Sequence, residues 1–382
     1  MADTKPSTEF RSLGFDPARA ARLMEEHGVG AVLVSLPENV YYTTGYPCIT
    51  GTGNPILFNL KNRLPAFSCI GANGEPTLLC WAFSTYGVTF GAEKVVGYED
   101  LGAAVSSVRQ VVAEQLGPAE KLGIESTCPQ YVLAALAEAG IDNERLVVVD
   151  SLLRALRLVK SPRELEVLEK SLEIAESCVD EIFSSLTIGS SRLALINEAK
   201  RYLFARGVDG ISHITISFGT ENPEIAIDEK LAENKLITLD VGAMVDGYCS
   251  DNRRYGFSGE IPEQITHLYK SMVAVVDSIG AVMKPGTPYS ELFEHGKKLL
   301  IDGNITGHEW LNHVGHSIGL EIEEDWIDDR VGPCIEEDMV VAIELYTITD
   351  ELVPIGNEET YHITPDGAKR LSMLPRELHR VA

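Results

Sequence analysis

The chain has 382 residues, 45% of them hydrophobic, and its 57 acidic and 32 basic side chains give a formal net charge of −25. A chain of this length folds as about two domains, and its negative charge disfavours a nucleic-acid partner, which requires a basic surface. No apolar run is long enough to span a bilayer, so no membrane partner is expected. The opening stretch MADTKPSTEFRS lacks the apolar core of a secretory signal, which predicts a cytoplasmic protein.

Helical and strand-like runs alternate through the first part of the chain. Strands are expected over residues 30–35, 77–83, 121–126 and 146–150, and helices over residues 18–27, 101–115 and 130–139. Alternation of this kind is typical of an α/β layer, which predicts a first domain over residues 1–155.

A second domain is predicted over residues 156–382, because a helix with a complete start signal begins at Ser161. The Ser161 side chain can cap that helix, Pro162 suits its first turn, and Glu164 completes a capping box. Two further helices are predicted, over residues 192–206 and 262–283.

The seven cysteines are dispersed, without the paired spacing of a zinc motif or of a disulfide framework. They are expected to be reduced and mostly buried. Cys249 lies next to the carboxylates described below, where a packing role is expected rather than a reactive thiol.

The stretch LDVGAMVDGYCSDNRR brings two carboxylates together. An apolar strand over residues 236–239 is predicted to deliver Asp240 into a Gly-rich turn, and the returning strand then presents Asp251. Two buried carboxylates side by side repel each other and lose hydration, a cost that divalent cations remove. The alternative is a polar hairpin whose aspartates only stabilise turns.

Three more candidate ligands follow. His313 and His316 stand in HVGHSIGLEIEEDW, and Glu344 interrupts the apolar strand VVAIELY, where a buried carboxylate needs a cation or several donors. Glu358 is predicted at the head of a short strand that a Pro-Asp-Gly turn closes.

With these residues in order, the chain resembles the pita-bread metallopeptidases, the family that includes aminopeptidase P, prolidase, methionine aminopeptidase and creatinase. DVGAMVDGYCSD looks like the family's Asp-turn-Asp hairpin, GHSIGL like its histidine motif, and EETYHITPDG like its last glutamate strand. Upstream, FDPARAARLMEEHGVGAVLVSLPENVYYTTGY is similar to the opening of a creatinase-type N-terminal domain, and RLVKSPREL to its junction with the catalytic domain.

The resemblance implies a fold and a ligand set. The fold is an α+β pita-bread catalytic domain preceded by an α/β creatinase-type N-terminal domain, in a homodimer. The implied metal ligands are Asp240, Asp251, His316, Glu344 and Glu358. Four carboxylates and one imidazole suit two divalent ions, with manganese expected first and iron, cobalt or zinc as alternatives. Such a pair can acidify a water and polarise a carbonyl or an amidine, which indicates hydrolysis of a carbon–nitrogen bond.

The chain departs from the resembling peptidases at two histidines. They place a histidine seven residues after the ligand histidine, where this chain has Glu323, and another in the loop before the first aspartate, where it reads GTENPEIAI. Glu323 is predicted to replace the lost imidazole as a general acid or base. The alternatives are that Glu323 and Glu324 are solvated charges and that Glu221 or Glu224 handles the proton or binds substrate.

Other side chains are candidates for substrate contacts. His313 can bind a substrate or intermediate, or stabilise its own loop. Arg253 can clamp a substrate carboxylate or neutralise the carboxylate cluster, and the same alternatives hold for Arg254. Tyr248 is a candidate substrate contact whose alternative is packing under the hairpin.

The sequence thus predicts a dinuclear metal-dependent hydrolase that resembles an X-Pro dipeptidase or aminopeptidase P and acts on a dipeptide or another small molecule. The missing histidines leave open a creatinase-like amidinohydrolase with a small cationic substrate, or a lyase similar to a dimethylsulfoniopropionate lyase. Intact ligands disfavour a metal-free binding module.

Overall fold

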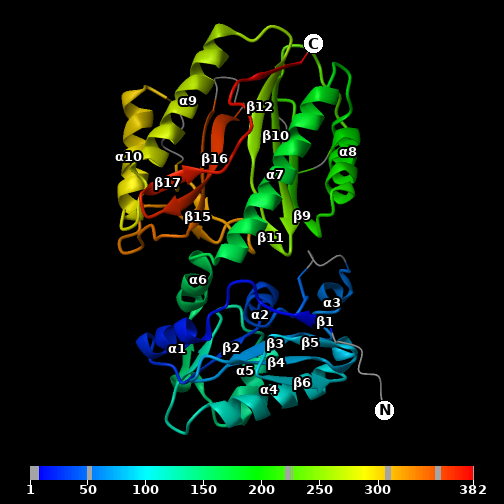
Figure 1. The fold of residues 1–382 in the computed structure, drawn as a ribbon, viewed down its shortest axis with the longest axis vertical. Coiled ribbons are helices and arrows are strands. Elements are labelled where there is room, and N and C mark those ends of the chain that lie inside the picture. The colour runs from blue at the N-terminus through cyan, green and yellow to red at the C-terminus, as the bar shows by residue number, and fades with distance from the viewer. Residues whose placement is uncertain are drawn as a thin grey trace. The chain divides into compact units, whose positions relative to one another are not determined.

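The computed structural model describes residues 8–49, 54–219, 225, 227–305, 311–348 and 354–381. The chain divides into two compact units, Met1–Arg157 and Leu158–Ala382 (Figure 1). The division predicted from the sequence, between residues 155 and 156, falls inside helix α6 (Asp150–Leu158).

The N-terminal unit is built on a mixed six-stranded sheet in the order β6-β4-β3-β2-β7-β8. Its strands are β2 (Ala31–Val34), β3 (Phe67–Ile70), β4 (Pro76–Trp81), β6 (Lys94–Tyr98), β7 (Leu122–Ile124) and β8 (Leu146–Val148). A separate parallel pair joins β1 (Thr8–Phe10) to β5 (Val88–Phe90).

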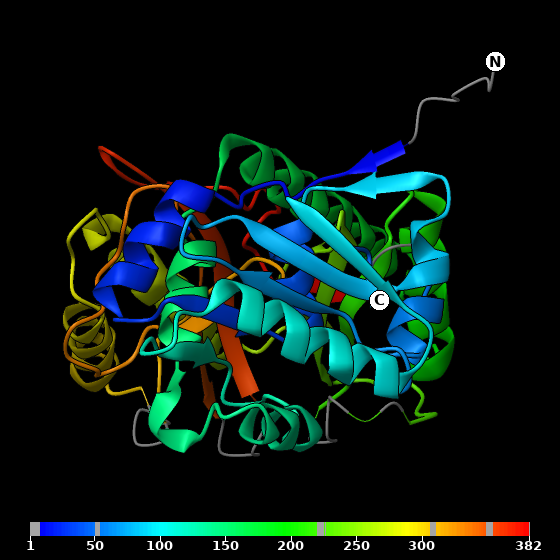
Figure 2. The ribbon, with the colours of Figure 1, turned by 90° about the horizontal axis from the view of Figure 1, so that it is seen from below.

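Helices α2 (Pro37–Thr44) and α4 (Leu101–Gln115) pack on this sheet, and α5 (Gln130–Glu138) packs on α4. The unit also has α1 (Pro17–Glu26), α3 (Ile56–Asn59) and 3₁₀ turns at Ala82–Thr85 and Asn143–Arg145. Figure 2 shows α4 lying across the strands. Valines of α4 and apolar residues of α5 pack with Ala31, Leu33 and Phe67 in one hydrophobic core, which stabilises this layer.

The C-terminal unit contains two five-stranded sheets. The first has the order β11-β10-β12-β18, with β9 also paired to β10. Its strands are β9 (Gly210–Ser217), β10 (Leu236–Val245), β11 (Tyr248–Cys249), β12 (Arg253–Ser258) and β18 (His379–Val381). The second sheet, in the order β14-β13-β15-β16-β17, has strands β13 (His316–Ser317), β14 (Asp325–Trp326), β15 (Val340–Ile348), β16 (Pro354–Thr364) and β17 (Gly367–Arg370).

Four long helices pack on these sheets: α7 (Pro162–Ser185), α8 (Arg192–Ala205), α9 (Glu263–Val282) and α10 (Tyr289–Asp302). Figure 1 shows α7 and α8 beside β9 and β10, and α9 and α10 beside the second sheet. Apolar residues of α9 and α10 share a buried cluster with Val341, Ile343 and Leu345 of β15. This core fixes the strand that carries Glu344.

The predicted start of α7 is confirmed. Ser161 accepts a hydrogen bond from the backbone N–H of Glu164, and the Glu164 carboxylate accepts one from the backbone N–H of Ser161. The capping box thereby satisfies two donors that a helix N-terminus leaves open.

Neither α2 nor α10 is among the helices predicted from the sequence. The face that α2 buries includes Asn39, Thr43 and Thr44, so its hydrophobic pattern is weak. Helix α10 buries Tyr289 and Leu300 among others, at a spacing that does fit a helix.

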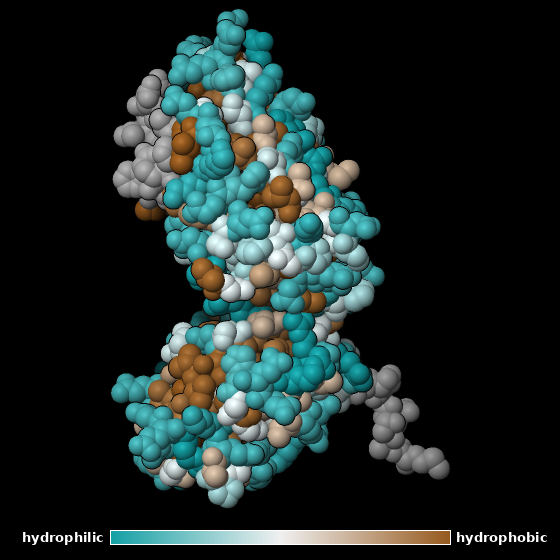
Figure 3. All heavy atoms as spheres, turned by 90° about the vertical axis from the view of Figure 1, so that its left-hand side faces the viewer, coloured by the Kyte–Doolittle hydropathy of each residue, from teal (hydrophilic) through white to brown (hydrophobic). Residues whose placement is uncertain are grey.

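The cysteines match their prediction, since none of the seven forms a disulfide and only Cys334 is not buried. Among the described helices, none is both long and apolar enough to cross a membrane. Hydrophilic residues cover most of the face drawn in Figure 3, as the net charge of −25 leads one to expect.

The capping box predicts a measurable loss of stability. Ser161→Ala is expected to lower the free energy of unfolding by about 1 kcal/mol, because an N–H of α7 loses its acceptor. Urea denaturation followed by circular dichroism would measure the change. The control is Ser177→Ala in the same helix, whose hydroxyl donates to the carbonyl of Glu173 and caps no helix end; equal losses in both variants would refute the capping role.

Candidate metal centre

The five predicted ligands come from both sheets of the C-terminal unit. Asp240 lies within β10 and Asp251 lies between β11 and β12, while His316, Glu344 and Glu358 belong to β13, β15 and β16. Ligand atoms of Asp251, His316 and Glu358 lie within 4.8 Å of one another. Residues that are more than a hundred positions apart in sequence therefore meet between the sheets.

Two ligands occupy other positions in their strands than the sequence predicted. Strand β10 does not end at Asp240 but continues to Val245, because beyond Asp240 it still pairs with β9 on one side and, at its end, with β11 on the other. Glu358 lies in the middle of β16 rather than at the head of a short strand. Both carboxylates are held by regular backbone ladders, which fix their directions more firmly than a turn would.

Glu344 and Glu358 stand directly opposite each other in the antiparallel pair of β15 and β16. Side chains in such a pair have Cβ atoms about 5 Å apart, and like charges there destabilise a sheet. Glu358 is fully buried, so water cannot relieve this repulsion. The arrangement requires positive charge nearby.

Arg253 supplies part of that charge. Its Nε and Nη2 donate to Oδ2 of Asp240 at 2.8 and 2.6 Å, and its Nη1 donates to Oε2 of Glu344 at 2.8 Å. Arg253 is also the cross-strand neighbour of Asp240. Of the two roles predicted for this side chain, the contacts favour neutralising the cluster over clamping a substrate carboxylate, because all three donor atoms named are already engaged.

His213, a residue that the sequence pattern did not single out, also reaches the centre. Its Nε2 lies 2.9 Å from Oδ1 of Asp240 and 3.3 Å from Oδ1 of Asp251. The loop GTENPEIAI has no histidine, as the sequence shows, and His213 comes instead from β9, upstream of that loop. Only the pairing of β9 with β10, which sequence pattern does not specify, brings it there.

Gly242 makes room for His213. The two residues are partners across the β9–β10 ladder, where the register shifts after Gly242. A Cβ atom on Gly242 would lie 2.6 Å from Cε1 of His213 and 2.0 Å from the Ser212 hydroxyl oxygen. The absence of a side chain lets the imidazole lean towards Asp240.

The other side of the centre keeps unused donor atoms. Among the residues that the structure describes, neither carboxylate oxygen of Glu358 nor Nε2 of His316 has a hydrogen-bond partner, and both side chains are completely buried. Nε2 of His316 lies 3.6 Å from Oδ2 of Asp251 and 3.8 Å from Oε1 of Glu344. Buried groups of this kind are costly unless they bind something.

The charges shift the pKa values of these groups in opposite directions. Burial opposes ionisation of Asp240, but Arg253 and His213 outweigh it and hold the pKa of that carboxyl below its usual range. Burial, reinforced by the charges of Asp251 and Asp240, raises the pKa of Glu358 well above its usual range. Burial would lower the pKa of His213, but Asp240 and Asp251 dominate and raise it to about 10. Thus the Asp240 side is already charge-paired, and the Glu358 side is not.

The donors on the His316 side fit a hard divalent cation. Carboxylate oxygens and one imidazole nitrogen are ligands that manganese, iron, cobalt and zinc accept, and the orphaned atoms of Glu358 and His316 point to a bound ion. The Asp240 side is different, because its Oδ2 already accepts two hydrogen bonds and its Oδ1 accepts one.

Glu323 and His313 lie beside this centre. Ligand atoms of Glu323, His316 and Glu344 lie within 4.8 Å of one another. Glu323 is exposed and accepts a hydrogen bond from Nε1 of Trp326 at 2.6 Å. The Trp326 ring in turn stacks on the His313 imidazole, with centroids 5.2 Å apart. Burial lowers the pKa of His313, which favours its neutral form.

A buried ion pair holds the loop that carries these residues. Nζ of Lys160 lies 2.8 Å from Oε2 of Glu324, and both side chains are essentially inaccessible to water. Oε1 of Glu324 accepts a hydrogen bond from the backbone N–H of Leu320. The alternative that Glu324 is a solvated charge is therefore wrong, and Lys160 anchors the segment between His316 and Glu323.

Three other predicted contacts have different outcomes. The Tyr248 hydroxyl donates to Glu164 of α7 at 2.9 Å and its ring is buried, so the prediction that it binds substrate gives way to packing under the hairpin. Arg254 is fully buried, pairs with Glu359, and donates to the backbone carbonyl of Glu358 at 2.8 Å, which positions β16. Glu221 lies outside the described residues.

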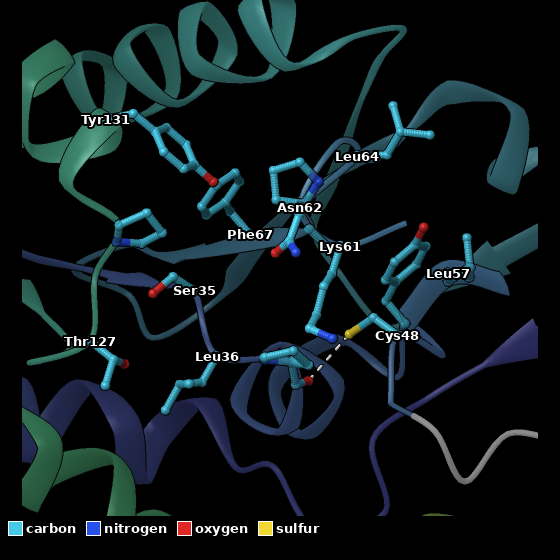
Figure 4. A pocket seen from close by; sticks show the side chains of 15 residues that line it. Ser35, Leu36, Cys48, Leu57, Lys61, Asn62, Leu64, Phe67, Thr127 and Tyr131 are labelled. Atoms are coloured by element: carbon cyan, nitrogen blue, oxygen red, sulfur yellow. Dashed lines mark hydrogen bonds between the residues drawn. The ribbon is translucent and has the colours of Figure 1, made fainter. Parts of the chain in front are cut away.

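A cavity of about 440 Å³ lies in the N-terminal unit (Figure 4). Side chains that include Cys48, Lys61, Phe67 and Tyr131 line it. None of the candidate metal ligands does, so this cavity is distinct from the carboxylate–histidine centre.

The two five-stranded sheets, the helices that pack on them and the carboxylate–histidine centre have the features of the pita-bread fold. Residues 166–365 match the model of metallopeptidase family M24, and residues 18–159 match the creatinase/prolidase N-terminal domain. Because the first match spans more than half of the chain, the protein belongs to metallopeptidase family M24. The α+β fold predicted from the sequence is confirmed.

Individual relatives agree with this family. The chain is 27% identical to an uncharacterized peptidase, YqhT, of Bacillus subtilis, over 93% of this chain and 97% of the relative. It is 25% identical to an Xaa-Pro dipeptidase of Pyrococcus furiosus, over 94% and 98%. The prolidase structure from Pyrococcus horikoshii superposes with a TM-score of 0.79 at 23% identity, over 95% and 99%. Together these matches support a peptidase-like hydrolase.

The Lys160–Glu324 pair yields a stability prediction. Lys160→Met leaves the Glu324 carboxylate buried without its cation, so the free energy of unfolding should fall by about 3–5 kcal/mol. The control is Lys298→Met, whose partner Asp302 is 59% exposed, with an expected change under about 1 kcal/mol. Urea denaturation of both variants would measure the difference. Similar small losses would mean that Lys160 does not anchor the loop.

Proposed function

We propose that this protein hydrolyses a carbon–nitrogen bond in a small polar substrate, with an Xaa-Pro dipeptide as the first substrate to test. The observation that carries the proposal is the meeting of buried Asp251, His316 and Glu358 with an exposed acid, Glu323, next to His316 and Glu344. A cation site and a proton-transfer group side by side are what hydrolysis of an amide requires. The names of the relatives point to the same reaction class.

The proposal includes divalent metal, with manganese first and iron, cobalt or zinc as alternatives. Such an ion supplies Lewis acidity towards a carbonyl or amidine and makes a bound water more acidic. The sequence predicts two ions on five ligands, and the unpartnered atoms of His316 and Glu358 support at least one. Asp251 and Glu344 complete the ligands on that side.

In this proposal Glu323 moves the proton. Its carboxylate takes a proton from the attacking water and returns it to the leaving nitrogen. The hydrogen bond from Trp326 holds one carboxylate oxygen in a fixed direction, and exposure gives the group access to substrate. General acid–base groups must lie within hydrogen-bond reach of the reacting atoms, which the proximity of His316 and Glu344 supports.

His313 is assigned to orienting the substrate. Its Nδ1 has no hydrogen-bond partner among the described residues, and Trp326 stacks on its ring. A neutral imidazole fixed by stacking can donate or accept one hydrogen bond, so it can hold a peptide carbonyl or an amide N–H in place.

One observation favours a second candidate, a creatinase-like amidinohydrolase. Glu323, an exposed carboxylate close to Glu344, stands where the resembling peptidases have a histidine. A small substrate that carries a guanidino or amino group can pair with this negative charge.

A homodimer remains part of the proposal. In the N-terminal unit Phe83 and Tyr86 are 72% and 89% exposed, which is unusual for large aromatic side chains and typical of residues that an interface covers.

The assignment of Glu323 predicts a specific kinetic change. Glu323→Gln should lower kcat on the order of 100-fold or more with little change in KM. The control is Asp329→Asn, an exposed acid nearby in sequence. Steady-state kinetics of both variants test this. A Glu323→Gln enzyme with the wild-type kcat would return Glu323 to the role of a surface charge.

A substrate comparison separates the two candidate functions. The purified protein, supplied with Mn²⁺, is assayed with an Xaa-Pro dipeptide and with creatine at equal concentration. Cleavage of the dipeptide alone supports the dipeptidase, and cleavage of creatine alone supports the amidinohydrolase. Turnover of neither substrate, from protein shown to be folded, would contradict the proposed function in both forms.

A further inference from the structure

Arg253 occupies the Asp240 side of the centre in a way that a mobile surface arginine does not. Its guanidinium spans the gap between the two sheets, with donors on Asp240 from the first sheet and on Glu344 from the second, all within 2.8 Å. The side chain is only 21% exposed. A guanidinium stays protonated, so this positive charge is permanent.

Together with Arg253, His213 engages both carboxylate oxygens of Asp240. Its Nε2 contacts Oδ1 at 2.9 Å while Arg253 donates twice to Oδ2. The same nitrogen lies 3.3 Å from Oδ1 of Asp251, which is where an ion shared by the two aspartates would have to bind. The space next to Asp240 is therefore filled by nitrogen atoms.

The opposite side of the centre offers a consistent set of ligands for one ion. Atoms bound to a single ion at about 2.1 Å lie no more than about 4.2 Å apart. Nε2 of His316 meets this condition with Oδ2 of Asp251, at 3.6 Å, and with Oε1 of Glu344, at 3.8 Å. Glu358 adds two oxygen atoms that have no partner in the described part of the chain.

We propose that the centre binds one divalent cation, through Asp251, His316, Glu344 and Glu358, and that the side chains of Arg253 and His213 take the place of a second ion beside Asp240. Arg253 supplies one positive charge and the ion supplies two, so three positive charges face the four carboxylates. The inference rests on the proposed function in one respect, that the centre binds a divalent metal ion.

Metal stoichiometry tests the proposal without reference to activity. The full-length protein is stripped with a chelator, loaded with excess Mn²⁺, desalted and analysed for manganese per chain. About one ion per chain is expected, with the six-line electron paramagnetic resonance spectrum of isolated Mn²⁺. Two ions per chain with a spin-coupled spectrum would overturn the proposal, and so would the absence of bound manganese.

Variants identify the groups involved. His316→Ala or Glu358→Gln should lose the bound ion, and retention of the ion in both would overturn the ligand assignment. The double variant Arg253→Ser/His213→Ala should gain a second ion, because both oxygens of Asp240 become free. The control is Arg376→Ser, which removes an arginine–aspartate pair outside the centre and should still bind one ion. If the double variant does not fold, the single variant Arg253→Ser is measured instead. A folded variant that still binds only one ion per chain would overturn the proposal.

The result is separable from that of the activity assays. One ion per chain without cleavage of any tested substrate would contradict the proposed function and leave this inference standing. Substrate cleavage by protein with two ions per chain would support the proposed function and contradict this inference.

Discussion

The structure of the C-terminal unit depends on the compensation of four carboxylates that face one another between two sheets. Glu344 and Glu358 are direct neighbours across a ladder, and Asp240 and Asp251 approach them from the other sheet. Without cations their repulsion would separate the sheets or shift the strands. Arg253 joins the sheets through two of these acids, so the same contact that balances charge also sets the distance between the layers.

Long-range anchors then keep the ligands in position. Arg254 ties β12 to the backbone of β16 at Glu358, and Lys160, from the segment before α7, holds the loop after His316 through Glu324. Among the residues that the structure describes, neither cation contacts a candidate ligand side chain: Arg254 binds the backbone carbonyl of Glu358, and Lys160 binds Glu324 in the loop after His316. Gly242 has the complementary effect, because it leaves the volume into which His213 leans. Rigid placement of this kind is what a catalytic carboxylate cluster requires.

Much of this could be predicted from sequence, and the remainder has a physical reason. The capping box at Ser161 and the helix over 101–115 are local signals, and the structure contains them. The motifs that pointed to the five candidate ligands are local signals too. His213 could not be assigned to the centre, because which strand pairs with β10 is a long-range property. Whether Arg253 faces acids or substrate, and whether Glu324 is solvated, depends on partners from other strands. The predicted end of the strand before Asp240 was wrong for the same reason, since pairing with β9 and β11 extends β10 to Val245.

The neighbouring arginines of β12 make the centre sensitive to chain length. Successive side chains of a strand point to opposite faces, so Arg253 meets the ligand carboxylates while Arg254 pairs with Glu359 on the reverse face. A deletion or insertion of one residue between Asp251 and Arg253 would exchange the two faces of the strand. Such a change would turn Arg254 towards Asp240 and away from Glu359, whose remaining cation Arg370 lies 4.0 Å away. Length variation in this connection should therefore be far more damaging than substitution of most single residues within it.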